Sequence, residues 1–193
     1  MIKLNKKNLV ISTVGDNSLH RNWNTKDADF DVCLIYFGEN EGYCGESKYY
    51  KKEKGYKYHL LQNYLNENPW FTKYDYIWLP DDDIFMETND VNKLFKFMYD
   101  YDLWIAQPSI IGHYGVKITL HQMGSLIRFT NWVEIMCPCF SSKSLEICKQ
   151  SFKENNTGWS IETIWNYLLG HPKDKIAIID DVIAIHTRAT CKG

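Results

Sequence analysis

Three short runs of mostly apolar residues, rich in β-branched and aromatic side chains, stand out in the first half of the chain. They cover residues 8–14 (NLVISTV), 31–37 (DVCLIYF) and 74–79 (YDYIWL), and a glycine or a proline directly follows each of them. Runs of this length that end at Gly or Pro predict buried β-strands.

Elsewhere, apolar residues recur at the spacing of an α-helix. Residues 56–66 show this spacing, and so does the segment after Thr88 and Asn89, two residues that favour the N-cap position of a helix. The apolar positions of that segment are Val91, Leu94, Phe95 and Met98. Residues 142–152 and 161–168 repeat the pattern. Four helices are therefore predicted.

The remaining pattern completes a sheet. Further extended segments are predicted at 103–107, 134–141, 176–179 and 182–186, with loop and hairpin over 112–134. Because strand and helix alternate through the first half, we expect an α/β fold with a mixed, mostly parallel central sheet flanked by helices. No repeat or linker divides the chain, so residues 1–193 read as one domain. Ligands of such sheets bind beyond the carboxyl ends of the strands.

Composition narrows the function classes. The chain has 193 residues, of which 45% are hydrophobic and 24% charged, so it can bury a core and is not a disordered protein. Its 15% of aromatic residues would suit stacking on a flat ligand or a sugar, although most of them must belong to the core. With 22 basic and 24 acidic residues the net charge is −2, which argues against nucleic-acid binding driven by bulk charge.

The sequence pattern predicts neither a membrane span nor a signal peptide. No run of 18 apolar residues predicts a membrane span, and the N-terminal apolar run is too short for a signal peptide. The six cysteines show no CxxC spacing, which favours reduced thiols in a cytosol-like compartment. We therefore expect a cytoplasmic protein, and its abrupt C-terminal end allows it to be part of a longer polypeptide.

An acidic cluster follows the third strand. Asp81, Asp82 and Asp83 stand at its carboxyl end, and in an extended segment residues 81 and 83 point the same way. Paired carboxylates suit a divalent cation such as Mg²⁺ or Mn²⁺. The pattern Asp-x-Asp is weak alone, because the chain contains it four times, at 27/29, 29/31, 81/83 and 100/102. Placement favours 81/83, and a solvated turn with a helix-capping Asp is the alternative.

One histidine ends the last predicted strand. His186 closes the apolar run 182–185 and is an acceptable further ligand for Mn²⁺, although a lone histidine is more often only hydrogen-bonded. Asp180 and Asp181 could supply a ligand instead, or could form a turn.

Candidates for acid–base chemistry lie in the second half. Glu162 lies on the flank of the buried stripe of the helix over 161–168, where it could act as a general base or could only cap the helix with Ser160 as N-cap. Trp159 beside it could stack on a sugar or pack in the interior. Glu134 is the second-choice base.

A phosphate would have to be bound by a metal ion and a lysine and not by a glycine-rich loop, because the sequence contains neither GxGxxG nor GxxxxGK[ST]. A dinucleotide-binding dehydrogenase and a P-loop NTPase are therefore unsupported. Lys57, from the local basic run 51–57, is the lysine that we expect near a phosphate, although such runs are usually solvated.

The order and spacing of several segments resemble a family of small GT-A glycosyltransferases that includes chlorovirus enzymes. The resemblance runs from residue 8 to residue 188. The segments are 12–23 (STVGDNSLHRNW), 30–32 (FDV), 36–38 (YFG), 54–57 (KGYK), 76–83 (YIWLPDDD), 134–138 (EIMCP), 158–162 (GWSIE) and 179–182 (IDDV), together with His186.

The resemblance implies a Rossmann-like, nucleotide-binding half over about 1–107 and an acceptor-binding half over about 108–193. Asp83 and His186 would hold Mn²⁺ or Mg²⁺, with Asp81 contacting the metal, its water or the ribose. The donor-binding residues would be Thr13, Val14, Gly15, Asp16, Gly38, Lys57, Asp81, Asp82 and Trp159. The family more usually has Gly-Trp-Gly-Leu-Asp where this chain has GWSIE, so its carboxylate is one methylene longer.

The expected activity is that of a metal-dependent hexosyl- or deoxyhexosyltransferase. A sugar would pass from a nucleotide-diphosphate sugar, most often a UDP-sugar, to a hydroxyl of a glycan, with inversion if Glu162 is the base. A virus-encoded enzyme acting in a host cytosol is compatible with the resemblance. Two alternatives stay open. They are a sugar nucleotidyltransferase, which would release pyrophosphate, and a non-catalytic glycan-binding module, which would need neither metal nor nucleotide.

Overall fold

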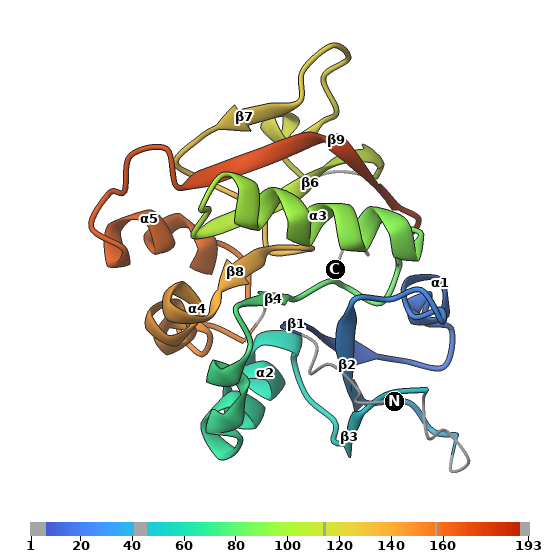
Figure 1. Ribbon diagram of the computed structural model, residues 1–193. Helices are drawn as coiled ribbons and strands as arrows, with labels where there is room; N and C mark the ends of the chain where they lie inside the picture. The colour runs from blue at the N-terminus through green and yellow to red at the C-terminus, as the bar shows by residue number, and fades with distance from the viewer. Residues whose placement is uncertain (1–6, 41–45, 114, 157, 190–193) are drawn as a thin grey trace.

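The computed structural model describes residues 7–40, 46–113, 115–156 and 158–189, which build a nine-stranded sheet with helices on both faces (Figure 1). Its strands are β1 (Asn8–Val14), β2 (Phe30–Tyr36), β3 (Tyr49–Lys52), β4 (Tyr76–Trp78), β5 (Ile84–Phe85), β6 (Ile105–Gly112), β7 (Ile127–Phe129), β8 (Cys139–Ser141) and β9 (Ile176–His186). Its α-helices are α1 (His20–Trp23), α2 (Lys57–Glu67), α3 (Thr88–Asp100), α4 (Ser142–Cys148) and α5 (Trp165–Leu168). Short 3₁₀ helices cover Pro69–Lys73, Lys117–Thr119, Lys149–Ser151 and Ile161–Ile164.

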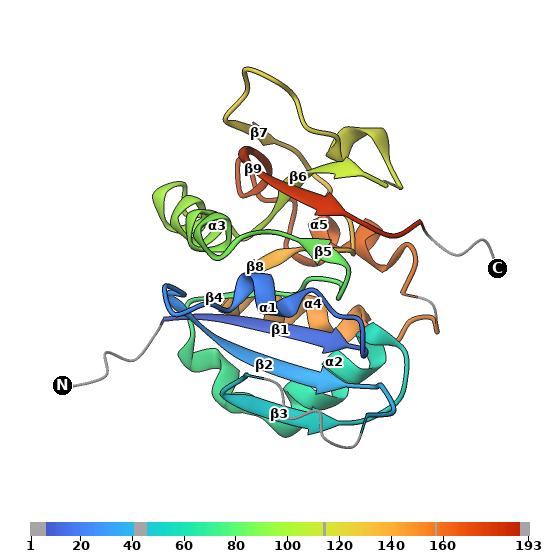
Figure 2. The same cartoon turned by 90° about the vertical axis from the view of Figure 1, so that its right-hand side faces the viewer.

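The strand order confirms the mixed, mostly parallel sheet. The order is β3-β2-β1-β4-β8-β6-β9-β5, and β7 pairs with β9. The long pairings of β1 with β2 and of β6 with β9 are parallel, whereas β8 runs antiparallel between β4 and β6 and joins the two halves into one sheet. In Figure 2 the arrowheads of β1, β2, β3 and β9 point toward the same edge. That edge carries the predicted site.

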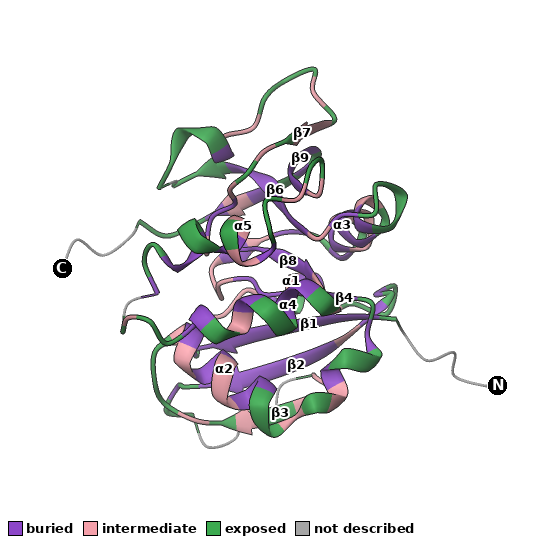
Figure 3. Cartoon of the chain, turned by 90° about the vertical axis from the view of Figure 1, so that its left-hand side faces the viewer, coloured by how far each residue is buried: buried purple, intermediate pink, exposed green. Residues whose placement is uncertain are grey.

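Two hydrophobic cores, one on each face, explain why the central strands read as continuous apolar runs. Along β1, Val10 and Val14 face the core covered by α1 and α3, while Leu9 and Ile11 face the core covered by α2, α4 and α5. A strand covered on both faces needs apolar residues at every position. Figure 3 shows the buried strands between these helices. Among the described residues, no helix has the length and apolarity that crossing a membrane requires.

The two strands predicted at 176–179 and 182–186 are one strand, β9, and Asp180 and Asp181 form no turn. The register of β6 against β9 shifts between Pro108 and Ser109, so the strand continues through an irregularity. Asp180 is buried there and pairs with Arg128, whose Nε lies 2.6 Å from its Oδ2. The sequence pattern predicted a strand end at Asp180 because it does not show that Arg128, which lies far away in the sequence, pairs with this aspartate.

Two other predictions need correction. Of residues 134–141, only Cys139–Ser141 form a strand, because the preceding segment bonds to the chain beyond β4 instead, as in the 2.7 Å bond from Asp81 N to Met136 O. The helix over 161–168 is split into a 3₁₀ turn and α5. Ser160 occupies the N-cap position with φ 70°, but its side chain forms no capping hydrogen bond.

Candidate active site

A pocket of about 700 Å³ opens at the carboxyl ends of β1, β4 and β9. Both halves of the chain line it. The predicted site residues in its lining are Thr13, Lys57, Asp81, Asp82, Asp83, Glu134, Trp159, Glu162 and His186. Residues that lie far apart in the sequence therefore meet in one cavity, at the edge that the strand pattern indicated.

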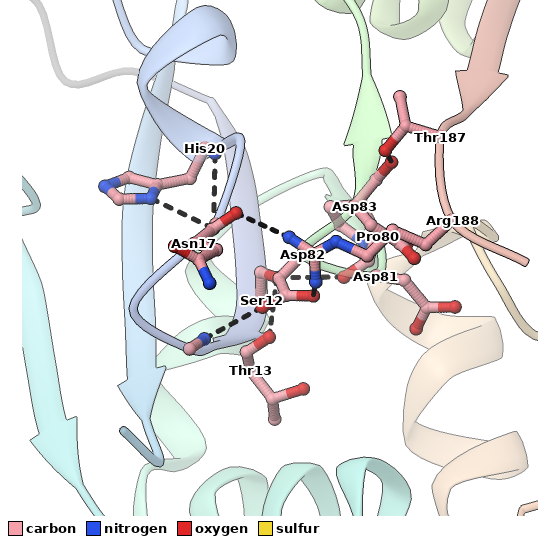
Figure 4. A network of polar contacts seen from close by, with 12 residues as sticks. Ser12, Thr13, Asn17, His20, Pro80, Asp81, Asp82, Asp83, Thr187 and Arg188 are labelled. Atoms are coloured by element: carbon pink, nitrogen blue, oxygen red, sulfur yellow. Dashed lines mark hydrogen bonds and ion pairs between the residues drawn. The ribbon is translucent and has the colours of Figure 1, made fainter. Parts of the chain in front are cut away.

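The acidic segment is held by its backbone from both halves of the protein (Figure 4). Ser12 at the end of β1 donates its hydroxyl to the carbonyl of Pro80 at 2.9 Å. Thr187, after β9, donates its hydroxyl to the carbonyl of Asp83 at 2.8 Å. These bonds fix the backbone of the acidic segment, so that its three carboxylates are presented at the pocket.

Asp83 and His186 form a pair that suits a cation. Nε2 of His186 lies 3.3 Å from Oδ2 of Asp83, and Nδ1 lies 2.8 Å from the carbonyl of His113. Because a carbonyl only accepts, Nδ1 carries a proton, and a neutral ring would turn the lone pair of Nε2 toward the carboxylate. A proton or a metal ion between the two groups removes that repulsion. Oδ1 of Asp83 is buried and has no hydrogen-bond partner among the described residues.

The pKa shifts agree with this pairing. The hydrogen bond with Asp83 raises the pKa of His186 above its ordinary value, against the opposing effect of burial. Burial by itself would raise the pKa of Asp83, but the hydrogen bond and the charge of His186, together with Arg188, outweigh it and leave the pKa lowered. The pair therefore favours an ionised carboxylate beside a positive charge.

Lys57 is committed to the protein. Its Nζ lies 2.6 Å from Oδ1 of Asp81 and donates to the carbonyls of Ile135 at 2.9 Å and Met136 at 3.3 Å. An ammonium has three donors, and these three acceptors match them. Burial raises the pKa of Asp81 in spite of Lys57. The lysine predicted near a phosphate thus lines the pocket as the partner of an aspartate.

Asp82 links the loop after β1 to the segment after β9. Its Oδ2 accepts a 2.9 Å hydrogen bond from Gly15 N, and its Oδ1 lies 3.3 Å from Nη1 of Arg188. Nη2 of Arg188 donates to the carbonyl of Asn17 (Figure 4). Sequence reasoning missed Arg188, whose one available signal was its position two residues after His186 at the same strand end.

Two buried glutamates face the other part of the pocket. Glu134 and Glu162 are each only 9% exposed. Burial, followed by the charge of Glu162, raises the pKa of Glu134 to about 7. Burial also raises the pKa of Glu162, against hydrogen bonds from its own backbone, from the Trp132 side chain and from the backbone of Ser160, so Glu162 also caps the turn that follows Ser160. Oε2 of Glu162 has no hydrogen-bond partner among the described residues. These properties suit the general base predicted at Glu162, a role that stays a prediction.

The predicted nucleoside-binding residues are only partly in the pocket. Thr13 lines it, but Val14 belongs to the core, and Gly15, Asp16 and Gly38 lie outside the lining. Asp16 accepts a hydrogen bond from the hydroxyl of Tyr36. The roles assigned to these four residues stay predictions.

Exposed aromatic side chains belong to the pocket lining. Trp159, 62% exposed, and Tyr56, 57% exposed, line it together with Trp132. The sequence alone left Trp159 undecided between stacking and packing, and its exposure removes the packing alternative. Trp132 and Phe37 also line the pocket and had no distinguishing pattern in the sequence.

Comparison with known proteins identifies the fold. The sequence matches no protein-family model and no curated protein. Among solved structures, a protein from Desulfovibrio desulfuricans G20 assigned as a nucleotide-diphospho-sugar transferase matches with a TM-score of 0.58 at 9% identity, over 94% of this chain and 83% of that one. Residues 1–349 of S. aureus TarS match with a TM-score of 0.58 at 10% identity, over 94% of this chain and 60% of that one. The same TarS fragment in complex with UDP-GlcNAc gives a TM-score of 0.53 at 10% identity, over 97% of this chain and 59% of that one.

This chain therefore spans about three fifths of the length of the TarS fragment. At such low identity the likeness establishes the shared architecture. The chain has the α/β fold of these solved structures, and its carboxylate pocket lies at the carboxyl ends of the strands of that fold.

Proposed function

We propose that the chain is a glycosyltransferase that moves a sugar from a nucleotide-diphosphate sugar to a hydroxyl of a glycan. One observation carries the proposal. A single pocket holds a cation-seeking pair, Asp83 and His186, together with a buried carboxylate, Glu162, that has an unpartnered oxygen. The fold shared with TarS, which has been crystallised with UDP-GlcNAc, supports a UDP-sugar as donor.

The metal expected at this site is Mn²⁺ or Mg²⁺. The unpartnered Oδ1 of Asp83 and the orientation of His186 fit such an ion. Within the described ranges no three acidic, His or Cys side chains are arranged as a metal site, and Asp81 is held by Lys57. Asp83 and His186 would therefore be its ligands from the protein, leaving positions for donor oxygens and water. When bound, the ion supplies charge stabilisation to the departing diphosphate.

Glu162 is the proposed general base. Its Oε2 takes the proton from the acceptor hydroxyl, the hydroxyl oxygen forms a bond to the anomeric carbon, and the bond from that carbon to the diphosphate breaks, so that the nucleoside diphosphate leaves with the electron pair. Attack on the face opposite the diphosphate inverts the anomeric configuration. The exposed rings of Trp159 and Tyr56 suit stacking on the acceptor sugar.

Two measurements test the proposal. Calorimetric titration with UDP, with and without Mn²⁺, should show metal-dependent binding in the wild-type protein that Asp83→Asn removes. Asp100→Asn is the matched control, because Asp100 belongs to another Asp-x-Asp pattern and is exposed at the end of α3. Failure to bind UDP in either condition would exclude the UDP-donor assignment.

The second measurement follows release of the nucleoside diphosphate from a panel of UDP-sugars with glycan acceptors. Glu162→Gln should keep UDP affinity and lose transfer by at least about 100-fold. Glu154→Gln, at an exposed position, is the control. Full transfer by Glu162→Gln would show that another residue is the base. Release of pyrophosphate from a nucleoside triphosphate would favour the nucleotidyltransferase alternative.

A further inference from the structure

Five carboxylates line the pocket in which the proposed function places a negatively charged diphosphate. They are Asp81, Asp82, Asp83, Glu134 and Glu162. Among the described lining residues, the permanently charged cations are Lys57 and Arg188. A diphosphate entering this field needs a cation from the protein besides any metal, so the contacts of these two residues decide which one can serve.

Lys57 is unsuited to that task. Its side chain is 17% exposed, and its ammonium has one carboxylate and two carbonyl partners within 3.3 Å. Turning toward a phosphate would leave Asp81 without its cation and two carbonyls without their donor. Leaving a buried charge unpaired is among the costliest changes in a protein. Lys57 therefore stays with Asp81 when a ligand binds.

Arg188 is suited to it. Its side chain is 44% exposed, and its contact with Asp82 is long, at 3.3 Å. The Asp82 side chain of this pair is only 15% exposed, but its other oxygen keeps the 2.9 Å hydrogen bond from Gly15 N when the guanidinium turns to a phosphate. A guanidinium also offers five donors in a planar fork that matches two phosphate oxygens.

The backbone of Arg188 is placed for this role. The preceding residue, Thr187, is fixed to the carbonyl of Asp83 through both its amide and its hydroxyl. From there the guanidinium reaches across the acidic segment to Asn17, in the loop after β1 (Figure 4). It thus lies between the proposed cation pair and the loop expected to receive the nucleoside, where the diphosphate has to pass.

We propose that Arg188, and not Lys57, is the side chain that binds the donor diphosphate, and that it exchanges Oδ1 of Asp82 for phosphate oxygens when the donor enters. The proposal rests on the proposed function for the identity of the anion. Asp82 holds the guanidinium in place beforehand and keeps its other oxygen on Gly15. Lys57 is a positioning residue for Asp81.

The experiment compares the affinities of UDP and uridine by calorimetric titration, at saturating Mn²⁺ and again in EDTA. Arg188→Ala should weaken UDP binding about 10- to 100-fold and change uridine affinity less than about twofold, because only UDP carries the phosphates. Arg188→Lys should have a UDP affinity between those of the wild type and Arg188→Ala, since lysine keeps the charge and loses the planar fork of donors. Arg21→Ala, an exposed arginine outside the pocket lining, is the matched control and should keep the wild-type ratio. Lys57→Met should also keep that ratio.

Equal UDP affinity in Arg188→Ala and the wild type would overturn the proposal, and so would a collapse of the UDP-to-uridine ratio in Lys57→Met. The Arg188 variants decide it even if Lys57→Met does not fold. If the wild type binds GDP in place of UDP, the same comparison is made with GDP and guanosine. A wild-type protein that binds no nucleoside diphosphate would refute the donor site itself, a result that differs visibly from an unaffected Arg188 variant.

Discussion

Glu134 should make the protein less stable as the pH rises toward and past neutrality. The carboxyl is 9% exposed, and burial followed by the charge of Glu162 raises its pKa to about 7, from 4.5 in the unfolded chain. Between these two values the folded protein keeps a proton that the unfolded chain has already lost, so raising the pH favours unfolding. A shift of about 2.5 units at about 1.36 kcal/mol each corresponds to about 3 kcal/mol.

The substitution Glu134→Gln removes this penalty while keeping the shape of the side chain. At pH 8 the variant should be about 3 kcal/mol more stable than the wild type through this group, which is roughly 6 to 12 °C in Tm for a domain of this size. At pH 4 the gain should vanish, because the carboxyl is then protonated in both states.

Urea and thermal unfolding of both proteins from pH 4 to pH 8.5 measure the effect. Glu146→Gln is the control, since the Glu146 side chain is 51% exposed in α4, and its effect should change little across that range. A Glu134→Gln gain that is the same at pH 5 and pH 8 would refute the reasoning, because it would mean that packing and not ionisation causes it. A wild-type-like variant at pH 8 would refute the raised pKa itself.

Two further predictions concern the scaffold. Asp180→Ala should lower the free energy of urea unfolding by about 3–5 kcal/mol, because it leaves the guanidinium of Arg128 without its carboxylate. Asp181→Ala, at the neighbouring position where the side chain is 38% exposed, should lower it by less than about 1 kcal/mol. Similar losses in the two variants would contradict the buried pairing. Ser12→Ala removes the donor to the buried carbonyl of Pro80 and should cost about 1–3 kcal/mol of unfolding free energy, a loss that would be absent if water replaced the hydroxyl.

Strands and helices with simple periodicity could be predicted from the sequence alone. The run 8–14 matches β1 because the residues after Asn8 are apolar, Ser or Thr, and Gly15 ends the run. The prediction was wrong where a distant partner decides the structure. Asp180 remains inside β9 because Arg128 neutralises it, and the segment before β8 follows the bonds it makes to the chain after β4. Such partners leave no periodic signal.

The site shows the same division. Asp83 and His186 could be placed at one edge of the sheet because Asp83 follows β4 and His186 ends β9. The short strand β5, whose Ile84 pairs with His186 and brings the two side chains together, was not predicted. Arg188 could not be placed in the site, because a single arginine two residues after a strand belongs to no sequence pattern that predicts its contacts. Lys57 lines the pocket, and its predicted contact with a phosphate stays a prediction. The sequence could not show that Asp81 and two backbone carbonyls take all its donors.

The charges of the pocket distinguish one carboxylate from the rest. Three of the five have a basic partner in the described structure: Asp81 has Lys57, Asp82 has Arg188, and Asp83 has the His186 ring, whose pKa it raises. Glu134, whose pKa is raised to about 7, is partly protonated near neutral pH. Glu162 has no cation, and one of its oxygens has no hydrogen-bond partner among the described residues. A buried oxygen in that state gains the most from a hydroxyl that donates to it, and an acceptor hydroxyl placed there is already hydrogen-bonded to the group that removes its proton. In the proposed reaction, this unpartnered oxygen would orient the acceptor hydroxyl for attack.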